Sequence, residues 1–421
     1  MADIQPLRAL RYDLARTGGL DPVLAPPYDV IDERQRLALE ARSPYNAVRI
    51  DLPRDPDGGD PYAHAARLLT QWRREGVLVR EEQPALWALA QEYTGPDGVA
   101  RRRLGFLARA RIEEYGPGRI RPHERTHPGP REDRLRLTRA TRANLSPVFS
   151  LFSDPDGAVR RALEAASARE PWGTGSDGEG TVSRLWRVAN PEAIAAVRAQ
   201  LTDAELLIAD GHHRYETARV YAEELGGEGP HRYVLMCLVA LEDPGLTVFP
   251  THRLVRGLSD TQVRRLAEAL QRHFEIEALA RLDQLYPPAG EIVRIGYIDA
   301  YSRRPYMLTL KDQGAVARAL PDRSDAYRKL DTAVLEALIL KGALGMSDEQ
   351  LEQLEGLGYA RDGERALELV RSGEYDAAFM MSPTPVSRVQ AIAAAGESMP
   401  PKSTYFFPKV PTGLVFNPLW E

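Results

Sequence analysis

The stretch LLIADGHHRYETA, residues 206–218, joins an apolar run, a glycine and a polar segment with helical character. The apolar run predicts a buried strand that ends at Asp210. Gly211 gives the main chain the freedom for a sharp turn and a close approach to a ligand. A helix is then expected from His212 up to the glycine pair at 226–227. The stretch therefore predicts a strand, a turn and a helix in direct succession.

The first turn of this predicted helix has the composition of an anion site. Its free N–H groups and the positive end of the helix dipole favour an anion by about 0.3–1 kcal/mol at an exposed position. His212 and His213 add hydrogen-bond donors, and Arg214 adds a guanidinium that can bind two oxygens at once. We interpret residues 211–214 as a phosphate cradle that lacks the lysine of a P-loop.

A purely structural interpretation fits the spacing of the same turn equally well. Gly211 would then only turn the chain, and Arg214 would pair with Asp210 or Glu216. In the functional interpretation, Asp210 orients a histidine or holds a magnesium ion. The residue types alone leave both interpretations open.

Two resemblances extend the functional interpretation. The run DGHHR, placed after a strand and at the start of a helix, resembles the phosphate-binding box of the ParB/sulfiredoxin superfamily, which includes sulfiredoxins, ParB CTPases and free-serine kinases. This resemblance implies that residues 211–214 face nucleotide phosphates. Segments along most of the chain are similar to the domain-of-unknown-function 1015 family of bacteria and archaea: APPYDVI, SPYNAVRIDLP, HERT, NLSPVFSLF, IADGHHRYETA and MPPKSTYFFPK. This second similarity implies that the segments form one site, and it names no substrate.

Strands interleaved with helices predict an α/β fold with a mixed, α+β-type sheet. In an N-terminal α/β region, residues 1–120, ALWALAQEY and VARRRLGFLARARI flank the turn TGPDG and predict an antiparallel hairpin. Residues 121–258 are expected to form the phosphate-binding core, which the resemblance makes ParB/sulfiredoxin-like. Residues 259–421 are expected to form a C-terminal α/β region whose apolar tail packs back on the body.

HERTHPGP, residues 123–130, contains H-E-x-x-H, which on a helix would place two zinc-binding imidazoles and a catalytic carboxylate on one face. Pro128 directly follows His127 and disfavours helical angles at that second histidine. We therefore expect no zinc site. The polar side chains of His123, Glu124 and Arg125 instead predict a loop that contributes to another site, and a solvated loop without a role is the alternative.

GTGSDG, residues 173–178, spells G-x-G-x-x-G, the pattern of dinucleotide-binding loops. Such a loop needs a strand before it and a helix after it, whereas this one follows a helical pattern and precedes another glycine. We interpret it as a flexible loop. The sequence contains no G-x-x-x-x-G-K-[ST] motif, so a P-loop is excluded.

Composition limits the classes of function. The 421 residues carry a formal net charge of −5. This negative charge argues against a protein that binds nucleic acid mainly through its overall electrostatic field. The one cysteine, Cys237, lies in an apolar run and is compatible with a reducing cytosol. The N-terminal residues lack a signal-peptide pattern, and no segment has the roughly 20 apolar residues that span a bilayer. We expect a cytoplasmic protein without a membrane partner.

Together the candidate segments predict an enzyme that transfers phosphate from ATP or another nucleoside triphosphate to a small hydroxyl metabolite, with Mg²⁺ at Asp210 as cofactor. Glu124 is expected to accept the proton of the attacking hydroxyl, and His123 and Asp210 complete the catalytic set. The expected phosphate-binding residues are Gly211, His212, His213, Arg214, Arg125 and Lys402. Lys402 is included because the chain contains only five lysines against fifty arginines.

Other functions remain open at this stage. The free-serine kinases make an amino-acid-like acceptor conceivable, and a related phosphatase or nucleotide hydrolase would use the same residues. The main alternative is a nucleotide-dependent switch or adaptor that binds without turnover and closes a homodimer, as in the ParB branch. A zinc hydrolase is the third hypothesis.

Overall fold

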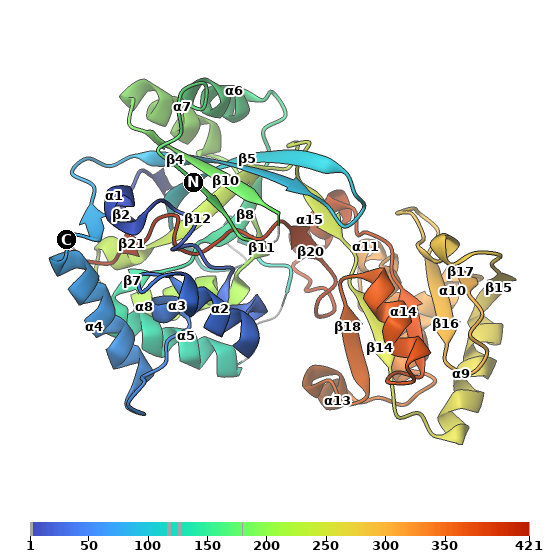
Figure 1. Cartoon of the computed structure of the whole chain (residues 1–421). Helices are drawn as coiled ribbons and strands as arrows, with labels where there is room; N and C mark the ends of the chain where they lie inside the picture. Colours follow the sequence, from blue (N-terminus) through green and yellow to red (C-terminus); the bar gives the residue numbers. More distant parts are fainter. Residues whose placement is uncertain (1–2, 116–118, 125–127, 179, 421) are drawn as a thin grey trace. The chain divides into compact units, whose positions relative to one another are not determined.

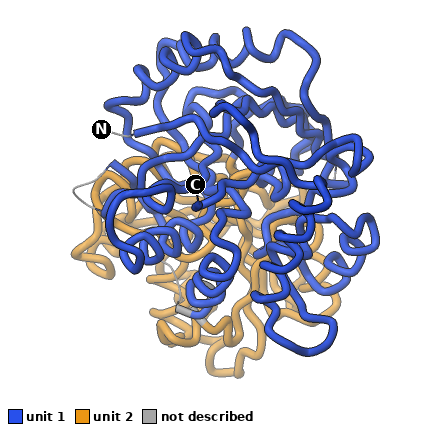
Figure 2. Tube along the Cα trace, turned by 90° about the vertical axis from the view of Figure 1, so that its left-hand side faces the viewer, with its two compact units in different colours: residues 1–247, 408–421 blue, residues 248–407 orange. Residues whose placement is uncertain are grey.

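The computed structural model describes residues 3–115, 119–124, 128–178 and 180–420. The chain folds into two compact units: residues 1–247 together with 408–421 (unit 1), and residues 248–407 (unit 2) (Figures 1 and 2). This division differs from the three regions expected from the sequence. Strands from residues 1–120 and from residues 121–258 pair within one sheet, so these two regions fold together.

Unit 1 is built around a nine-stranded mixed sheet with the order β6-β11-β8-β12-β5-β4-β10-β9, and β1 pairs with the end of β5. β11 is parallel to β6 and β12 is parallel to β8, while the other neighbours are antiparallel. The predicted mixed α/β class is therefore confirmed. The strands span Ile4–Gln5 (β1), Leu86–Thr94 (β4), Ala100–Arg111 (β5), Ile120–Arg121 (β6), Val148–Phe152 (β8), Gly173–Ser176 (β9), Val182–Val188 (β10), Leu206–Asp210 (β11) and Tyr233–Ala240 (β12).

Apolar runs explain the centre of this sheet. Every residue of β12 after Tyr233 is buried, as a continuous apolar strand covered on both faces requires. Cys237 belongs to this run, and burial raises the pKa of its thiol to about 12, so the side chain is an inert core residue. β4 and β5 form the predicted antiparallel hairpin, with Trp87 opposite Leu107.

The helices of unit 1 begin and end at ordinary capping residues. α4, for example, has Pro61 in its first turn, and the Asp60 carboxylate accepts a hydrogen bond from the Tyr62 amide. Figure 1 shows α6 and α7 on one side of the sheet and α4 and α5 on the other. The helices span Leu14–Thr17 (α1), Glu33–Arg42 (α2), Val48–Asp51 (α3), Pro61–Arg74 (α4), Pro128–Thr141 (α5), Ala158–Ala166 (α6), Pro191–Leu201 (α7) and His212–Leu225 (α8).

The stretch GTGSDG corrects one expectation. Its first four residues form β9, which pairs antiparallel with β10, so they are not a flexible loop. The reason lies in the glycines: a Cβ on Gly173 would lie 2.7 Å from Leu20 Cδ1, and a Cβ on Gly175 would lie 2.6 Å from Leu24 Cδ1. The strand therefore approaches the segment around Leu20 more closely than any residue with a side chain allows.

Unit 2 contains a six-stranded sheet with the order β15-β17-β16-β19-β14-β18. β16 and β17 form an antiparallel hairpin, and the side chain of Ser259 caps α9. The strands span His252–Val255 (β14), Phe274–Ala278 (β15), Arg294–Asp299 (β16), Tyr306–Leu310 (β17), Leu357–Ala360 (β18) and Ala377–Met380 (β19). The helices span Asp260–His273 (α9), Gln313–Ala319 (α10), Asp325–Arg328 (α11), Asp331–Val334 (α12), Asp348–Gln353 (α13), Gly363–Arg371 (α14) and Val386–Ala394 (α15).

The C-terminal segment returns to unit 1. Its strand β21 (Asn417–Pro418) pairs with β7 (Ala143–Asn144), and Phe416 and Leu10 exchange main-chain hydrogen bonds. Thr412 and Phe416 are completely buried. Among the described residues, no helix is long and apolar enough to cross a membrane.

Candidate functional site

The strand, turn and helix predicted from residues 206–218 are present. β11 ends at Asp210, Gly211 adopts a left-handed conformation with φ 90°, and α8 begins at His212. A Cβ on Gly211 would also lie 2.8 Å from Nε of Arg214, so both the backbone angle and the close approach require glycine. No described side chain caps the amino end of α8. This end of the helix therefore has the main-chain geometry of an anion site.

Two neighbouring strands bring His123, Glu124 and DGHHR to the same edge of the sheet. β6 runs parallel to β11, with Ile120 opposite Leu206, so the residues that follow the two strands leave the sheet together. β6 leads directly into Pro122 and His123, and β11 leads into Gly211. Between Ile208 and Asp210 the pairing of β11 with β8 shifts its register, an irregularity that turns the end of the strand.

His123 and His212 contact each other at this edge. Their ring centroids lie 4.7 Å apart, and the rings are nearly perpendicular at 78°. The main-chain N–H of His123 donates to Nε2 of His212 over 3.3 Å, and Nδ1 of His123 lies 2.7 Å from the carbonyl oxygen of Ile208. These bonds fix the tautomers: the ring proton lies on Nδ1 in both neutral histidines.

Both imidazoles are neutral at pH 7. His123 is completely buried, and burial lowers its pKa to about 4. Burial, with a smaller contribution from His123, also holds the pKa of His212 well below its usual value. The two rings therefore serve as fixed hydrogen-bonding groups and do not supply positive charge.

Glu124 is the partly exposed group of this cluster. One carboxylate oxygen lies 3.9 Å from Nε2 of His123, and the other lies 4.0 Å from Nδ1 of His212. Its side chain is 28% exposed, whereas that of His212 is 4% exposed. The carboxylate therefore lies beside the first residue of α8 and can be reached from solvent. This is the position that a general base needs, and that role stays a prediction.

Arg214 adopts the arrangement that the structural interpretation predicted. Its Nη2 donates to Asp210, and its Nη1 donates to the carbonyl oxygen of Pro147, so the guanidinium folds back over Gly211. Burial disfavours the charged form of Arg214, but the charges of Asp210 and Asp29 outweigh it and raise the pKa. Arg214 therefore braces the turn, and any contact with a phosphate would use its remaining donors.

Lys409 is a member of this cluster that sequence reasoning missed. Its ammonium donates to Oδ1 of Asp210, while Arg214 donates to Oδ2. Burial by itself raises the pKa of Asp210, but the two cations outweigh that effect, and the pKa lies well below its ordinary value. Because both carboxylate oxygens already hold cations, Asp210 does not fit the predicted role of magnesium ligand. Lysine is rare in this chain, and the rarity that singles out Lys402 is also the signal that could have found Lys409.

Other predicted segments also reach this cluster. Tyr28 begins the short helix η1 (Tyr28–Val30), and its ring lies 4.0 Å from the guanidinium of Arg134. Burial raises the pKa of Tyr28 to about 12 against the opposing charge of Arg214. Asp51, from SPYNAVRIDLP, accepts hydrogen bonds from Ser146 over 2.6 Å and from Thr412 over 3.1 Å. Residues from all six segments named by the resemblance therefore lie around this cluster in unit 1, with Lys409 as the last residue of MPPKSTYFFPK.

Comparison with known proteins places this chain in a family. The sequence profile of a family described as "Protein of unknown function (DUF1015)" matches residues 4–333. The chain belongs to this family. No curated protein matches it.

The solved structures that match this DUF1015 chain have low identity to it and low TM-scores. A conserved hypothetical protein from Pyrococcus furiosus is 17% identical, with a TM-score of 0.36 over 70% of this chain and 90% of the other. A free serine kinase in complex with AMP is 16% identical, with a TM-score of 0.36 over 68% and 83%. SbnI from Staphylococcus aureus, truncated at its C-terminus, is 11% identical, with a TM-score of 0.37 over 73% and 86%. Such similarity decides no function for the DUF1015 chain.

The other predicted residues are His213, Lys402 and two residues outside the described part of the chain. Arg125 and His127 fall outside the described residues. His213 is half-buried in the first turn of α8. Lys402 belongs to unit 2, where its ammonium lies 5.1 Å from the centroid of the Tyr359 ring. Its predicted phosphate contact stays a prediction.

The zinc interpretation gains no support. His123 and Glu124 precede α5, which begins at Pro128, so they do not lie on a helix. Within the described residues, no group of three or more potential ligand side chains could hold a metal ion. His127 lies outside the described residues, so the expectation that H-E-x-x-H is coincidental here stays a prediction.

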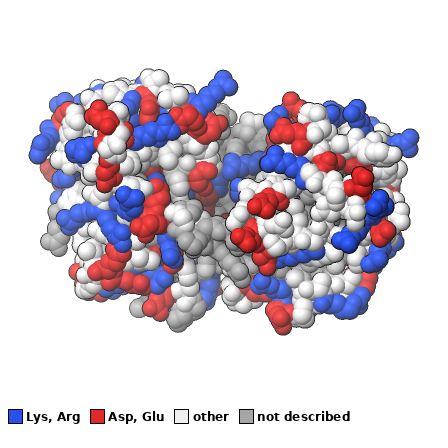
Figure 3. All heavy atoms as spheres, turned by 90° about the horizontal axis from the view of Figure 1, so that it is seen from below, with Lys and Arg blue, Asp and Glu red and all other residues white. Residues whose placement is uncertain are grey.

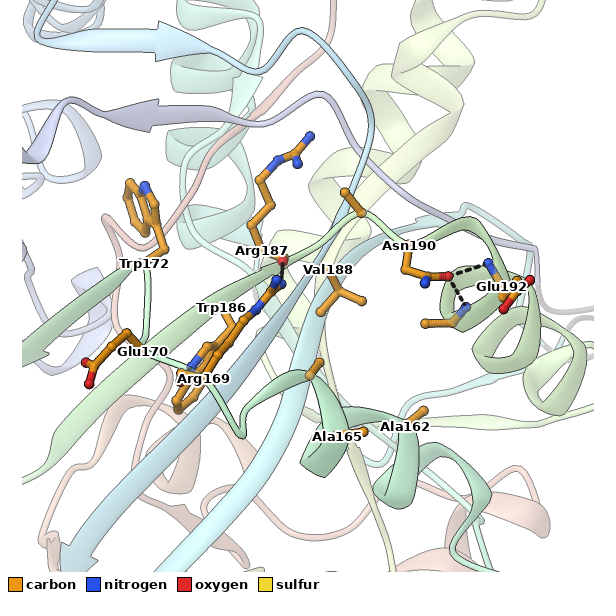
Figure 4. A pocket seen from close by; sticks show the side chains of 13 residues that line it. Ala162, Ala165, Arg169, Glu170, Trp172, Trp186, Arg187, Val188, Asn190 and Glu192 are labelled. Atoms are coloured by element: carbon orange, nitrogen blue, oxygen red, sulfur yellow. Dashed lines mark hydrogen bonds between the residues drawn. The ribbon is translucent and has the colours of Figure 1, made fainter.

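A pocket of about 760 Å³ in unit 1 lies away from the predicted site residues. Its walls come from α6, β10 and the start of α7, and none of the predicted site residues lines it (Figure 4). Asn190 already caps α7 there by accepting from the amides of Glu192 and Ala193. On the face shown in Figure 3, acidic and basic side chains are mixed over the described surface, as the small net charge leads one to expect.

Proposed function

We propose that this DUF1015 chain binds the phosphates of a nucleoside triphosphate at the amino end of α8 and transfers a phosphoryl group to a small hydroxyl compound. The observation that carries the proposal is the place of Glu124, a partly exposed carboxylate 4.0 Å from the first residue of an uncapped helix. An anion site and a candidate base at one sheet edge are what a phosphotransferase requires.

Each described group has a task in this proposal. The amides and dipole of α8 attract the phosphate, and the Nδ1–H of His212 faces the carboxylate of Glu124. Glu124 accepts the proton of the attacking hydroxyl, and the buried charge of Arg214 offsets charge on the transferred group. Asp210 does not fit a magnesium ligand, so no step of the proposal passes through it.

The proposal also covers the phosphate donor, the acceptor, the location and the oligomeric state. The resemblance of DGHHR to the ParB/sulfiredoxin box supports a nucleotide as donor and a core of that type. The proposal also includes an amino-acid-like acceptor, a cytoplasmic location and a homodimer. A nucleotide switch without turnover would use the same anion site and lack the proton transfer at Glu124.

The test measures binding and turnover separately. Purified protein is incubated with ATP, GTP or CTP, with and without magnesium, and thermal stability and transfer to small hydroxyl compounds are followed. Glu124→Gln is expected to bind nucleotide normally and to lose transfer by about a hundredfold or more. Glu114→Gln, a substitution of an exposed glutamate, is the matched control and should behave as the unchanged protein.

The outcomes separate the hypotheses. Binding without turnover in the unchanged protein would favour the switch over the enzyme. Equal turnover in Glu124→Gln and the unchanged protein would remove Glu124 from the mechanism. A complete lack of nucleotide binding would contradict the proposal as a whole.

A further inference from the structure

Unit 2 contains a pocket of about 410 Å³. Its walls come from the segment after β15, the turn between β16 and β17, and the last residues of α14. Main-chain hydrogen bonds hold these segments in place. The amide of Leu279 donates to the carbonyl oxygen of Pro305 over 2.9 Å, and the amide of Ala300 donates to that of Asp376 over 2.8 Å. The pocket is therefore built into the fold of unit 2, and its volume is that of a small-ligand site.

The floor of this pocket is apolar. Ile298 and Val370 line it, are 2% and 1% exposed, and belong to one hydrophobic cluster with the other buried residues of α14. Leu282, which begins the short helix η3 (Leu282–Leu285), packs against the same cluster. A molecule bound in the pocket would therefore have hydrocarbon on one side.

Three arginines line the same pocket: Arg281, Arg303 and Arg371. Arg281 is bound to Asp283, to which its Nε and Nη2 donate over 3.0 and 2.6 Å. Arg303 donates from Nε to the carbonyl oxygen of Ala300 over 3.4 Å. Among the described residues, no acidic side chain forms an ion pair with Arg303 or Arg371. Two guanidinium groups therefore keep most of their donors for a ligand.

The turn that carries Arg303 is held by Asp299, the one carboxylate in the pocket wall. Asp299 accepts from the amide of Ser302 over 2.5 Å and from its hydroxyl over 3.0 Å. Arg303 itself has φ 55°, in the left-handed region that favours glycine. The turn alone would suit glycine better, so it does not explain an arginine at this position.

The acidic side chains on and after α14 form no ion pair with Arg371. Asp362 and Glu364 lie within electrostatic reach of Tyr286, as Arg371 does, but they stand at the start of α14, which Arg371 ends. The next acidic side chains have other partners: Glu368 pairs with Arg365, Glu374 acts on the same arginine, and Asp376 accepts from the amide of Leu258.

Three guanidinium groups, with the carboxylates of Asp299 and Asp283, leave one positive charge above an apolar floor. We propose that this pocket binds a small organic acid, whose carboxylate lies between Arg303 and Arg371 and whose apolar body lies on the floor. Each guanidinium then makes a charge-assisted hydrogen bond, and the floor is removed from water. A phosphate ion lacks the apolar body, and a neutral compound lacks the charge. The inference concerns unit 2 alone and does not depend on the proposed phosphate site of unit 1.

The test compares four probes on the full chain. Benzoate, acetate, benzyl alcohol and inorganic phosphate are titrated, and binding is followed by ligand-observed nuclear magnetic resonance, which detects weak binding. Benzoate is expected to bind more tightly than each of the other three. Arg303→Met and Arg371→Met should each weaken benzoate about fivefold, the effect of one solvent-accessible charged contact. Arg272→Met, which changes an exposed arginine in the last turn of α9, should leave the affinity unchanged.

Further measurements separate binding from folding. Thermal unfolding without ligand shows whether each variant is folded, and Arg371→Lys, which keeps the charge, should retain more affinity than Arg371→Met. Equal affinity of the unchanged protein for benzoate and benzyl alcohol, or for benzoate and acetate, overturns the inference. A folded double variant, Arg303→Met with Arg371→Met, that binds benzoate as tightly as the unchanged protein also overturns it. So does a lack of benzoate binding, even if nucleotide transfer is found.

Discussion

At the scale of single residues, the buried histidine His123 links the site to the stability of the fold. Its pKa is about 4 in the folded chain, against an ordinary value of 6.5. Below pH 6.5 the unfolded chain binds a proton that the folded chain does not, so the free energy of unfolding falls as the pH falls towards 4. The contribution of this group is about 3 kcal/mol at most, from the size of the shift.

The substitution His123→Asn tests this dependence. Its amide can still donate to the carbonyl oxygen of Ile208 but does not titrate, so the free energy of unfolding should depend less steeply on pH between 6.5 and 4. Denaturant unfolding at several pH values measures the slope. His64→Asn controls for loss of an imidazole elsewhere in unit 1. A slope equal to that of the unchanged protein would show that His123 takes up no proton on unfolding.

The two lysines near the C-terminus show where reasoning from residue types stops. Lysine is rare in this chain, and that rarity pointed to Lys402 within MPPKSTYFFPK. The structure places Lys409, from the end of the same segment, on Asp210. The two partners are 199 positions apart, so their meeting depends on the path of the returning tail. No local pattern encodes that path.

At the scale of elements, β11 and α8 could be predicted because each boundary has its own signal. Asp210 ends an apolar run, Gly211 has the conformational freedom that the turn needs, and a helical pattern follows. β9 could not be predicted, because glycines have no side chain to alternate between the faces of a sheet. What makes Gly173–Ser176 a strand is the space left by Leu20 and Leu24.

The substitution Gly175→Ala tests this explanation of β9. The added methyl group would lie 2.6 Å from Leu24 Cδ1 and 2.9 Å from Leu20 Cβ, so one of the segments must move. We expect a loss of about 1–3 kcal/mol in the free energy of unfolding, the usual cost of overpacking. Thr174→Ala, on the exposed face of the same strand, should change it by less than about 0.5 kcal/mol. Similar small effects for both variants would contradict the close packing.

At the scale of the whole molecule, the two units do not correspond to the consecutive stretches into which the sequence pattern divides the chain. The sequence divided the chain at residues 120 and 258, where its pattern changes. One sheet contains strands from both sides of the first boundary, because β5 from one region pairs with β12 from the next. The last fourteen residues belong to unit 1, although unit 2 precedes them in the chain. Long-range pairing of this kind is decided by burial, which short motifs do not report.

The tail is therefore expected to contribute to the stability of unit 1. Phe416 is completely buried, and its ring lies 5.7 Å from that of Tyr12 in an edge-on arrangement. Phe416→Ala should lower the free energy of unfolding by about 3–5 kcal/mol, the usual cost of such a cavity. Tryptophan fluorescence measures this in unit 1 alone, because all five tryptophans lie there. A loss below about 1 kcal/mol would show that the tail is dispensable for the core.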